Sequence, residues 1–461
     1  MKVSQSFPDR SVCMIGMGYV GLTLAVAMAE AGFRVHGVEA NGDIVESIRA
    51  GRAPFREAGL DGVVVEQVAS GAMSVSQAWP APGECNVYIV TVGTPLAAGQ
   101  KATNLDSIRA VTQRLASNLR PNNMVILRST VRVGVSRSIV KPVLDAAKVP
   151  YSLAFCPERT LEGKALQELR TLPQIVGGAD HASSVRAAQL FGHLTSSTIR
   201  VSDLETAEMI KLVNNTQRDL MFAFANEVAD ICDALGVSAP EVIEAGNRDY
   251  PRGGMPLPGP VGGPCLEKDP YILAEGVAGR GADVRLTMMG REVNEGVPRR
   301  AAEIMTEELS SRIAPGKAAK GVVMGVAFKG RPETSDLRGT LAIPLIAELR
   351  RLYPQTPLYG YDPAVPAEDI RSLGIEPCAS PEDAFQGATF VIYQNNNAAF
   401  EDLDLAALSK RMQQDGVIYD MWNQYLDARQ KLRSDVAYLG LGTRLFAEQR
   451  PAITRAAAND A

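Results

Sequence analysis

The sequence predicts an α/β protein in which two Rossmann-like, doubly wound parallel-sheet domains are joined by a long central helix and a helical middle domain. Short β-rich runs alternate with helical stretches from residue 11 to about residue 200. A stretch without Gly or Pro follows, and the alternation resumes beyond residue 314. Such alternation implies βαβ units and mostly parallel sheets. The length of 461 residues, at about 150 residues per domain, allows roughly three domains.

The first α/β region, residues 1–201, contains short apolar runs that are typical of buried strands. They predict strands at Val12–Ile15, Arg34–Glu39, Asn86–Val92, Met124–Ser129 and Ser152–Phe155. Segments rich in Ala, Leu and Glu lie between these runs and predict helices, as at Leu22–Ala31 and Leu105–Leu119. We assign the region to one domain.

The middle region, residues 202–314, is predicted to be helical. Ser202-Asp203-Leu204-Glu205 has the spacing of a capping box, and no Gly or Pro follows until Gly236. So long a helix suits a connector and dimer interface, although an ordinary core helix would give the same pattern. Residues 237–262 are rich in Gly and Pro and predict a loop, and a second helical region runs from Pro270 to about Leu309.

The third region, residues 315–446, repeats the α/β pattern. It contains predicted strands at Gly321–Phe328, Leu358–Asp362, Thr389–Tyr393 and Val417–Tyr419, and a predicted helix at Leu341–Leu352. Residues 447–461 form a tail that is rich in Ala and Arg.

Composition excludes several classes of protein. The net charge of -5 argues against a nucleic-acid-coating protein or a polybasic membrane-surface protein. The three histidines are scattered and no C-x-x-C pair occurs among the six cysteines, so we expect no metal site and reduced thiols. There is no export signal and no apolar run of membrane-spanning length, so we expect a cytoplasmic protein.

A glycine-rich motif indicates the cofactor. Gly16, Gly18 and Gly21 fit G-x-G-x-x-G, directly after a predicted strand and at the start of an apolar helix. Glycines at these positions allow a tight turn and close approach to a pyrophosphate, which the helix N-terminus then faces. Glu39 ends the next predicted strand, where a carboxylate can accept the ribose hydroxyls. No Arg follows it, so the pattern favours NAD over NADP.

A second glycine-rich segment, residues 262–270, contains a candidate nucleophile. We expect Asp269 to be the N-cap of a helix and Pro270 its first residue. Cys265 then lies just before a helix N-terminus and near Lys268, and both features favour a reactive thiolate. A structural cysteine and a purely capping aspartate are the alternatives.

Three further sets of residues are candidates for chemistry. Lys211 and Asn215 are four residues apart and lie on one face of the central helix. Glu158 and Glu162 follow a strand, at the edge of the sheet where α/β sites form. Lys329 follows the first strand of the third region and could meet a phosphate. The alternatives are a solvated Lys211 on the helix, a charged surface turn around Glu158 and Glu162, and a solvated Lys329.

Taken together, the motifs resemble the UDP-glucose/GDP-mannose dehydrogenase family of nucleotide-sugar 6-dehydrogenases. The resemblance runs from about residue 11 to residue 443, and its blocks occur in the family's order. They are GMGYVG (16–21), VGTP (92–95), STV (129–131), PERTLEG (157–163), KLVNN (211–215), GGPCLEKD (262–269), FKG (328–330) with DLR (336–338), and YDP (361–363).

The resemblance implies an NAD-dependent, four-electron oxidation of a sugar 6-hydroxyl to a carboxylate, for the synthesis of surface-polysaccharide precursors. It makes Cys265 the nucleophile that forms a thiohemiacetal and then a thioester. By the same resemblance Lys211 and Asn215 stabilise the oxyanion, Asp269 with Thr130 positions water, and Glu162 is the acid–base carboxylate.

The family also implies the binding residues. Those for NAD are Gly16, Gly18, Tyr19, Val20, Gly21, Glu39, Thr94, Thr130 and Lys268. Those for the UDP-sugar are Glu158, Arg159, Leu161, Lys211, Asn215, Arg252, Gly262, Phe328 and Lys329. The third region is then the UDP-sugar-binding domain, and the helical middle builds a homodimer or a higher homo-oligomer.

Departures from the family pattern bear on the sugar. Arg159 after Glu158 resembles the branch that acts on UDP-N-acetylhexosamines, especially UDP-N-acetylmannosamine, and UDP-N-acetylglucosamine is a further candidate. UDP-glucose is the alternative. The UDP-N-acetylhexosamine branch commonly has His where this chain has Pro264. In addition, Trp422 replaces the Arg of the family's D-x-R. A single-oxidation β-hydroxyacid dehydrogenase and a nucleotide-binding scaffold are the competing readings.

Overall fold

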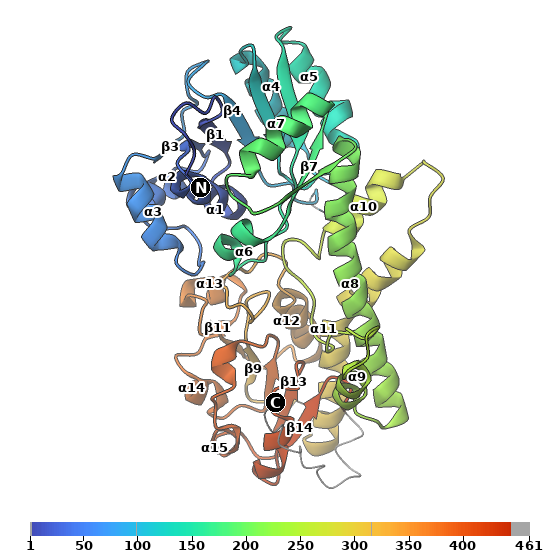
Figure 1. Ribbon diagram of the computed structural model, residues 1–461. Coiled ribbons are helices and arrows are strands. Elements are labelled where there is room, and N and C mark those ends of the chain that lie inside the picture. The colour runs from blue at the N-terminus through green and yellow to red at the C-terminus, as the bar shows by residue number, and fades with distance from the viewer. Residues whose placement is uncertain (1, 98, 315, 444–461) are drawn as a thin grey trace. The chain divides into compact units, whose positions relative to one another are not determined.

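The computed structural model describes residues 2–97, 99–314 and 316–443 and shows two compact units (Figure 1). The first contains Met1–Gln217 and Cys265–Met288, and the second contains Arg218–Pro264 and the chain from Met289 onward. Two long helices, α8 (Leu204–Leu235) and α11 (Arg285–Arg312), supply residues to both units. The division into three functional domains remains a prediction, and the expected tail at 447–461 lies outside the described residues.

An eight-stranded sheet forms the centre of the first unit, in the order β3-β2-β1-β4-β5-β6-β7-β8. Neighbouring strands are parallel except β6 and β7, which are antiparallel. The strands are β1 (Ser11–Ile15), β2 (Arg34–Val38), β3 (Met73–Ser76), β4 (Val87–Val90), β5 (Asn123–Leu127), β6 (Tyr151–Phe155), β7 (Gln174–Gly178) and β8 (Thr198–Val201).

Both faces of this sheet are buried, as a doubly wound fold requires. In β1, Val12 and Met14 belong to one apolar cluster, whereas Cys13 and Ile15 belong to another. The helices of the unit are α1 (Tyr19–Glu30), α2 (Gly42–Arg49), α3 (Leu60–Ala69), α4 (Asp106–Asn118), the π-helical turn η1 (Ser136–Val140), α5 (Lys141–Asp145), α6 (Ala165–Thr171), α7 (His181–Phe191) and α10 (Asp269–Val277).

The second unit contains a six-stranded, wholly parallel sheet in the order β11-β10-β9-β12-β13-β14. Its strands are β9 (Gly321–Met324), β10 (Leu358–Tyr361), β11 (Glu376–Pro377), β12 (Phe390–Tyr393), β13 (Val417–Asp420) and β14 (Ala437–Gly440). Its other elements include α9 (Ala239–Asn247), α12 (Ala342–Leu352), α13 (Ala367–Ser372), α14 (Pro381–Phe385), α15 (Leu405–Ser409), η2 (Ala398–Phe400) and η3 (Leu426–Lys431). The predicted fold class is confirmed.

The strand order has a direct consequence for ligand binding. Six strands of the first sheet and all six of the second follow the order 3-2-1-4-5-6 of a dinucleotide-binding fold. The order in which successive strands are added to the sheet reverses between β1 and β4 in one sheet and between β9 and β12 in the other. Ligands of such sheets bind beyond the carboxyl ends of these strands, which is where the loops carrying the predicted motifs begin.

Three local predictions were wrong. The N-cap of α8 is Asp203, whose Oδ1 accepts from the Thr206 N–H at 2.7 Å, and not Ser202, because either residue type can cap and Asp203 directly precedes the helix. Residues 237–262 are not all loop, since Ser238 caps α9. The helical region expected from Pro270 to Leu309 is two helices, separated by a break in which Gly279 and Gly281 take positive φ.

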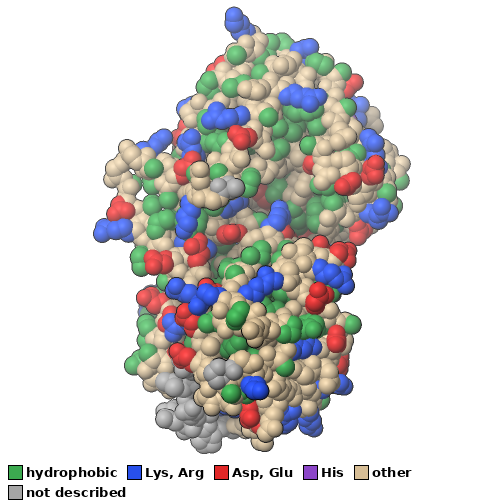
Figure 2. Space-filling model, turned by 180° about the vertical axis from the view of Figure 1, so that it is seen from behind, with side chains coloured by type: hydrophobic (Ala, Val, Ile, Leu, Met, Phe, Trp, Pro, Cys, Tyr) green, Lys and Arg blue, Asp and Glu red, His purple; other side chains and the backbone are tan. Residues whose placement is uncertain are grey.

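The surface gives two further facts. On the face seen in Figure 2, Lys and Arg side chains are interspersed with Asp and Glu, in keeping with the small net charge of -5. Among the residues that the structure describes, no helix combines the length and the apolar character needed to cross a bilayer.

Candidate active site

The G-x-G-x-x-G loop has the geometry of a dinucleotide site. Gly16 takes φ +92°, and a Cβ on Gly21 would lie 1.8 Å from the Gly16 carbonyl oxygen, so both positions require glycine. A Cβ on Gly18 would meet nothing within 4 Å, which leaves this side of the loop open to a ligand. Helix α1 begins at the next residue, Tyr19, and Val20 follows it in the first turn.

The residues predicted around this loop fit NAD. Glu39 directly follows β2, and its carboxylate accepts from the Met17 N–H at 2.7 Å and the Asn41 N–H at 3.0 Å, which holds it against the glycine loop. Thr94 donates its hydroxyl to the Thr130 carbonyl at 2.5 Å and thereby joins the loops after β4 and β5. The open glycine face, the helix N-terminus and an acidic residue at the end of β2 together form the donor and acceptor set that NAD needs.

Glu158 lies in a buried ion pair rather than at the surface. Arg128 donates its Nε to Glu158 Oε2 at 2.9 Å, and a second guanidinium nitrogen contacts the same oxygen. The other oxygen, Oε1, accepts the backbone N–H groups of Arg159 and Thr160, each at 2.8 Å. Burial alone would raise the pKa of Glu158, but the charges of Arg128 and Lys211 and these hydrogen bonds hold it below its ordinary value.

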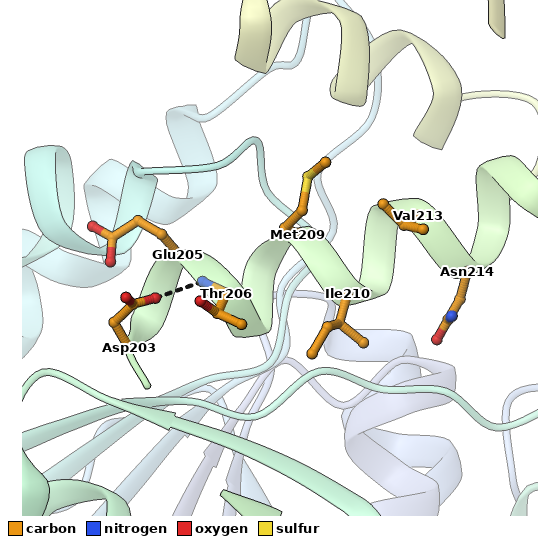
Figure 3. Close-up of a pocket in the computed structure, with 7 residues that line it drawn as sticks. All are labelled: Asp203, Glu205, Thr206, Met209, Ile210, Val213 and Asn214. Carbon is orange, nitrogen blue, oxygen red and sulfur yellow. Dashed lines mark hydrogen bonds between the residues drawn. The ribbon is translucent and has the colours of Figure 1, made fainter. Parts of the chain in front are cut away.

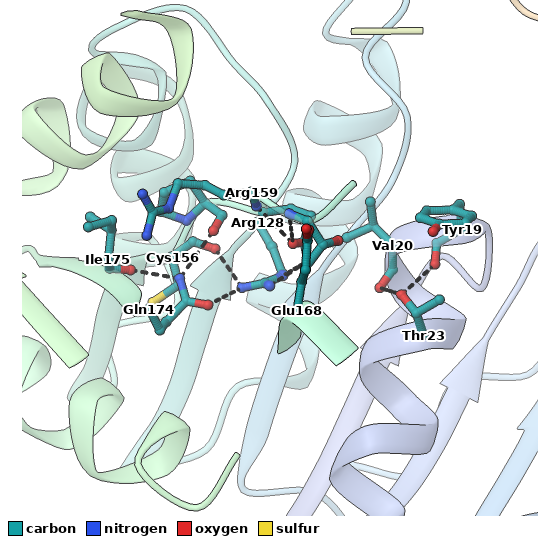
Figure 4. Close-up of polar contacts among 12 residues, drawn as sticks. Tyr19, Val20, Thr23, Arg128, Cys156, Arg159, Glu168, Gln174 and Ile175 are labelled. Carbon is teal, nitrogen blue, oxygen red and sulfur yellow. Dashed lines mark hydrogen bonds and ion pairs between the residues drawn. The ribbon is translucent and has the colours of Figure 1, made fainter. Parts of the chain in front are cut away.

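The loop that carries Glu162 is fixed by two further carboxylates. The Leu161 N–H donates to Glu168 at 2.6 Å, and the Gly163 N–H donates to Glu57 at 2.6 Å. Figure 4 shows the hydrogen bonds that Arg128 donates to Cys156 and Gln174, with Tyr19 on α1 in the same view. Glu57 was missed by the sequence analysis because a single Glu in a loop gives no pattern from which its burial could be inferred.

The contacts described for Arg159 and Leu161, two residues predicted to bind the substrate, lie within the first unit itself. The Arg159 guanidinium donates to the Pro173 carbonyl, so this end of the side chain is tied to the first unit's own backbone. The Leu161 N–H is bound by Glu168 as described, and the Leu161 side chain is half-buried. Their contact with a sugar stays a prediction.

Cys265 lies in an exposed turn directly before α10. Its carbonyl oxygen accepts the N–H groups of Lys268 at 3.2 Å and Asp269 at 2.9 Å. The prediction that Asp269 is the N-cap was wrong by one residue, because the N-cap is Lys268 and the Asp269 side chain makes no capping bond. That carboxylate is fully buried and accepts instead from Lys268 Nζ at 2.8 Å and from Asn215 Nδ2 at 2.6 Å.

The face of α8 that carries Lys211 and Asn215 is buried in the first unit, which rules out the reading of these two as solvated side chains. Asn215 binds Asp269, and Lys211 is close enough to Glu158 to lower its pKa. The structure therefore connects Lys211 with Glu158, and Asn215 with Asp269 and Lys268. Among the described residues, no group of three His, Cys, Asp or Glu side chains could hold a metal ion.

In the second unit, the segment that carries Gly262 lies against the segment after β9 that carries Phe328. A Cβ on Gly263, which takes φ +93°, would lie 2.4 Å from the Phe328 ring, and the Lys329 ammonium lies 5.2 Å from the centre of that ring. A Cβ on Gly262 would lie 2.2 Å from the Gly339 carbonyl oxygen. The glycines let this backbone pass directly over the phenyl ring.

Arg252 lies on an exposed loop of the second unit. Its Nε donates to the Tyr250 hydroxyl at 3.0 Å, and its guanidinium carbon lies 4.6 Å from the centre of the Tyr250 ring. Its predicted contact with the UDP-sugar stays a prediction.

Trp422 contacts the loop that leads to the cysteine motif. A Cβ on Gly259 would lie 2.7 Å from the indole ring, and Trp422 Nε1 donates to the Gln394 carbonyl at 2.9 Å. Gly259 is also held by Asn226 of α8, which accepts its N–H at 2.8 Å and donates to its carbonyl at 3.1 Å. No local pattern predicts this pair of hydrogen bonds, because Asn226 and Gly259 are 33 residues apart.

Comparison with known proteins agrees with these observations. Three domain descriptions of the UDP-glucose/GDP-mannose dehydrogenase family match the chain: the NAD binding domain at residues 10–195, the central domain at 205–296 and the UDP binding domain at 322–427. The match to the central domain spans Cys265, and the match to the UDP binding domain spans Trp422.

Individual relatives cover most of the chain. It is 30% identical over 406 residues to UDP-N-acetyl-D-mannosamine dehydrogenase of Methanocaldococcus jannaschii, covering 87% of this chain and 89% of that protein. It is 30% identical over 415 residues to NDP-N-acetyl-D-galactosaminuronic acid dehydrogenase of Ralstonia nicotianae, covering 87% and 94%. The structure matches UDP-D-ManNAc dehydrogenase of Pyrococcus horikoshii with a TM-score of 0.84 at 27% identity, covering 94% and 99%.

The match to all three domains removes both competing readings, since neither a β-hydroxyacid dehydrogenase nor a nucleotide-binding scaffold accounts for it. The chain belongs to the UDP-glucose/GDP-mannose dehydrogenase family and is an NAD-dependent nucleotide-sugar dehydrogenase.

Proposed function

We propose that the protein oxidises the C6 hydroxyl of a UDP-N-acetylhexosamine to the uronic acid, with Cys265 as the covalent nucleophile. The observation that carries this proposal is the arrangement in the first unit. Exposed Cys265 lies in the turn that leads into α10, and Asp269, the first residue of that helix, is hydrogen-bonded to Asn215 of α8. A nucleophile and a buried polar cluster are thereby joined through one short turn.

The chemistry needs two oxidations with one covalent capture between them. NAD, when bound, accepts the hydride in each oxidation. The alcohol first becomes an aldehyde, and the Cys265 thiolate adds to C6 to form the C–S bond of a thiohemiacetal. Loss of the second hydride and of the hydroxyl proton gives a thioester. Water then adds to C6 and the C–S bond breaks, which releases the carboxylate and regenerates the thiol.

The residues of the site divide this work. Lys211 supplies a fixed positive charge for the oxyanion at C6, with Asn215 as a neutral donor beside it. Asp269, held by Lys268 and Asn215, positions the hydrolytic water together with Thr130. Glu162 exchanges protons with the substrate hydroxyl. Both oxygens of Glu158 are already bonded, so Glu158 supports the loop and does not carry protons.

Two observations favour an N-acetylated sugar. The relatives in Methanocaldococcus jannaschii and Pyrococcus horikoshii are named for N-acetylmannosamine, and the Ralstonia nicotianae relative is named for N-acetylgalactosaminuronic acid. Arg159 also follows the branch pattern for such sugars. UDP-N-acetylmannosamine is the first candidate and UDP-N-acetylglucosamine the second, with UDP-glucose as the alternative, and the uronic acid would serve as a surface-polysaccharide precursor in the cytoplasm.

We also propose that α8 forms the interface of a homodimer. Phe224, Ile231 and Leu235 on this helix are exposed, Leu235 to 71%, although they are large and apolar. An open groove of about 450 Å³ runs along the start of the helix, where Met209 and Val213 contribute apolar lining (Figure 3). Apolar surface of this kind on a long helix marks a protein–protein contact.

A substrate panel tests the proposed function. The purified protein is mixed with NAD and with UDP-N-acetylmannosamine, UDP-N-acetylglucosamine, UDP-N-acetylgalactosamine, UDP-glucose or GDP-mannose, and NADH is followed by absorbance. We expect about two NADH per sugar and the highest kcat/KM with a UDP-N-acetylhexosamine. One NADH per sugar with accumulating aldehyde would contradict the covalent route, and a preference for UDP-glucose would contradict the N-acetyl assignment.

A further inference from the structure

We propose that Glu57 is a positioning residue that fixes the Glu162 loop against the first turn of α1, so that one buried carboxylate aligns the acid–base group with the cofactor loop. This inference rests on the proposed role of Glu162. Glu57 itself belongs to none of the predicted motifs and lies in the segment between α2 and α3.

Glu57 accepts hydrogen bonds from two separate parts of the first unit. Its Oε2 accepts from the Tyr19 hydroxyl at 2.5 Å and from the Gly163 N–H at 2.6 Å. Its Oε1 accepts from the Ala165 N–H at 2.8 Å. Tyr19 is the first residue of α1, and Gly163 directly follows Glu162, so the carboxylate joins the start of α1 to the loop that carries Glu162.

The burial of Glu57 makes these bonds necessary. The residue is 8% exposed, and a carboxylate removed from water is strongly destabilising unless its oxygens are hydrogen-bonded. Burial, and then the bond to Glu57, raise the pKa of Tyr19, so its hydroxyl stays a donor. The Phe55 ring packs against Tyr19 with a centroid distance of 4.9 Å and closes the other side of this contact.

The hydrogen bonds around Glu162 indicate that Glu57 affects the position of the loop as well as its stability. The residue before Glu162 is held by Glu168 and the residue after it by Glu57, so the backbone is fixed on both sides. Glu168 belongs to the helix that directly follows the loop, whereas Glu57 is 106 residues away from Gly163 in sequence. The Gly163 N–H also donates to the Tyr19 hydroxyl at 3.1 Å, so Glu57 and the hydroxyl that it holds together set the loop relative to α1.

The test combines a double-mutant cycle with amide exchange. Glu57→Ala should reduce kcat about 10- to 100-fold, since misplacing a reacting group by an ångström has effects of this size. In a Glu162→Gln background the same change should reduce kcat less than about threefold, because both substitutions act on one group. Glu57→Gln keeps one acceptor oxygen and should lie between the wild type and Glu57→Ala.

Hydrogen–deuterium exchange without NAD gives a readout that does not depend on activity. Glu57→Ala should speed exchange at the Gly163 and Ala165 amides. Glu66→Ala, the same substitution at an exposed position of α3, should leave exchange and kcat unchanged.

Three outcomes decide the matter. Unchanged exchange at Gly163 and Ala165 would overturn the proposal, and so would losses of kcat that multiply in the double variant. Full turnover by Glu162→Gln would instead reject the proposed role of Glu162, while the exchange data would still decide whether Glu57 fixes the loop.

Discussion

Cys265 is the residue on which the proposed covalent route depends. Cys265→Ala removes the atom that bonds to C6, so steady-state formation of uronic acid should fall by at least about 1,000-fold, as measured by NADH release. Cys378→Ala, the same change at a buried thiol, is the control and should keep near wild-type turnover. Turnover that survives in Cys265→Ala would remove the nucleophile from the mechanism.

Glu158 gives a residue-scale prediction about stability. Because its folded-state pKa lies below its ordinary value of 4.5, its contribution is present above that value and is lost as the pH falls through the folded-state pKa. Glu158→Gln leaves Arg128 buried without its partner, so the free energy of unfolding at pH 7 should fall by roughly 3–5 kcal/mol.

Urea denaturation at several pH values measures this effect. The difference between the wild type and Glu158→Gln should narrow as the pH is lowered below 4.5. Glu205→Gln is the matched control, because Glu205 pairs with Arg137 at the surface, and its effect should stay below about 1 kcal/mol. An equal loss in both variants would mean that burial of the Arg128–Glu158 pair has no consequence.

At the scale of elements, two glycines in the turn between β1 and α1 have different roles: we expect Gly21 to be needed for folding and Gly18 for binding NAD. Gly21→Ala would place a Cβ 1.8 Å from the Gly16 carbonyl oxygen, so this variant should be destabilised by several kcal/mol, of the order of 3. In Gly18→Ala the added methyl group meets no protein atom, so the free energy of unfolding should lie within about 0.5 kcal/mol of the wild-type value. We expect the same methyl group to face the pyrophosphate of bound NAD.

Calorimetric titration with NAD distinguishes the two variants. Gly18→Ala should bind NAD about tenfold more weakly or worse, which corresponds to about 1.4 kcal/mol, while its thermal midpoint stays near that of the wild type. NAD affinity equal to the wild type in Gly18→Ala would place the pyrophosphate elsewhere.

Elements were predictable where one signal dominated. Val12–Ile15 and the other long apolar runs became central strands, because burial on both faces makes every position apolar. Strands β3 and β8 were missed, since each has four residues at a sheet edge and carries polar side chains. Strand β7 was missed because the pair Gly177-Gly178 is typical of a turn. In the structure Gly177 is needed for close packing instead, since a Cβ there would lie 2.2 Å from the Asp203 carbonyl oxygen.

The site was predictable in its chemistry and less so in its contacts. Lys211 and Asn215 share a face because helical spacing is local information. The partners of Asp269 and the role of Glu57 depend on tertiary packing across 54 and 106 residues, which no spacing rule reports. The capping role predicted for Asp269 failed for this reason: Asn215 and Lys268 already occupy its oxygens.

At the scale of the whole molecule, the proposed dimer is open to direct measurement. Phe224→Glu combined with Ile231→Glu would place two charges on the exposed apolar face of α8, so the dimer should dissociate to monomers at micromolar concentration. Sedimentation velocity reports the change. Ile343→Glu alters a similarly exposed apolar residue on α12 and should leave the oligomeric state as it is. A monomeric wild type would contradict the assignment of α8.

The uneven exposure of the six cysteines makes the protein suited to quantitative labelling. Five thiols are buried and Cys265 alone among the six is exposed, so a mild alkylating reagent should add one group to each folded chain and up to six to an unfolded one. The number of labels per chain, measured by intact mass spectrometry, would then give the fraction of a preparation that is folded and has an unmodified Cys265 thiol. The same label supplies a single fluorophore or spin probe at the turn before α10, without any cysteine having to be removed first.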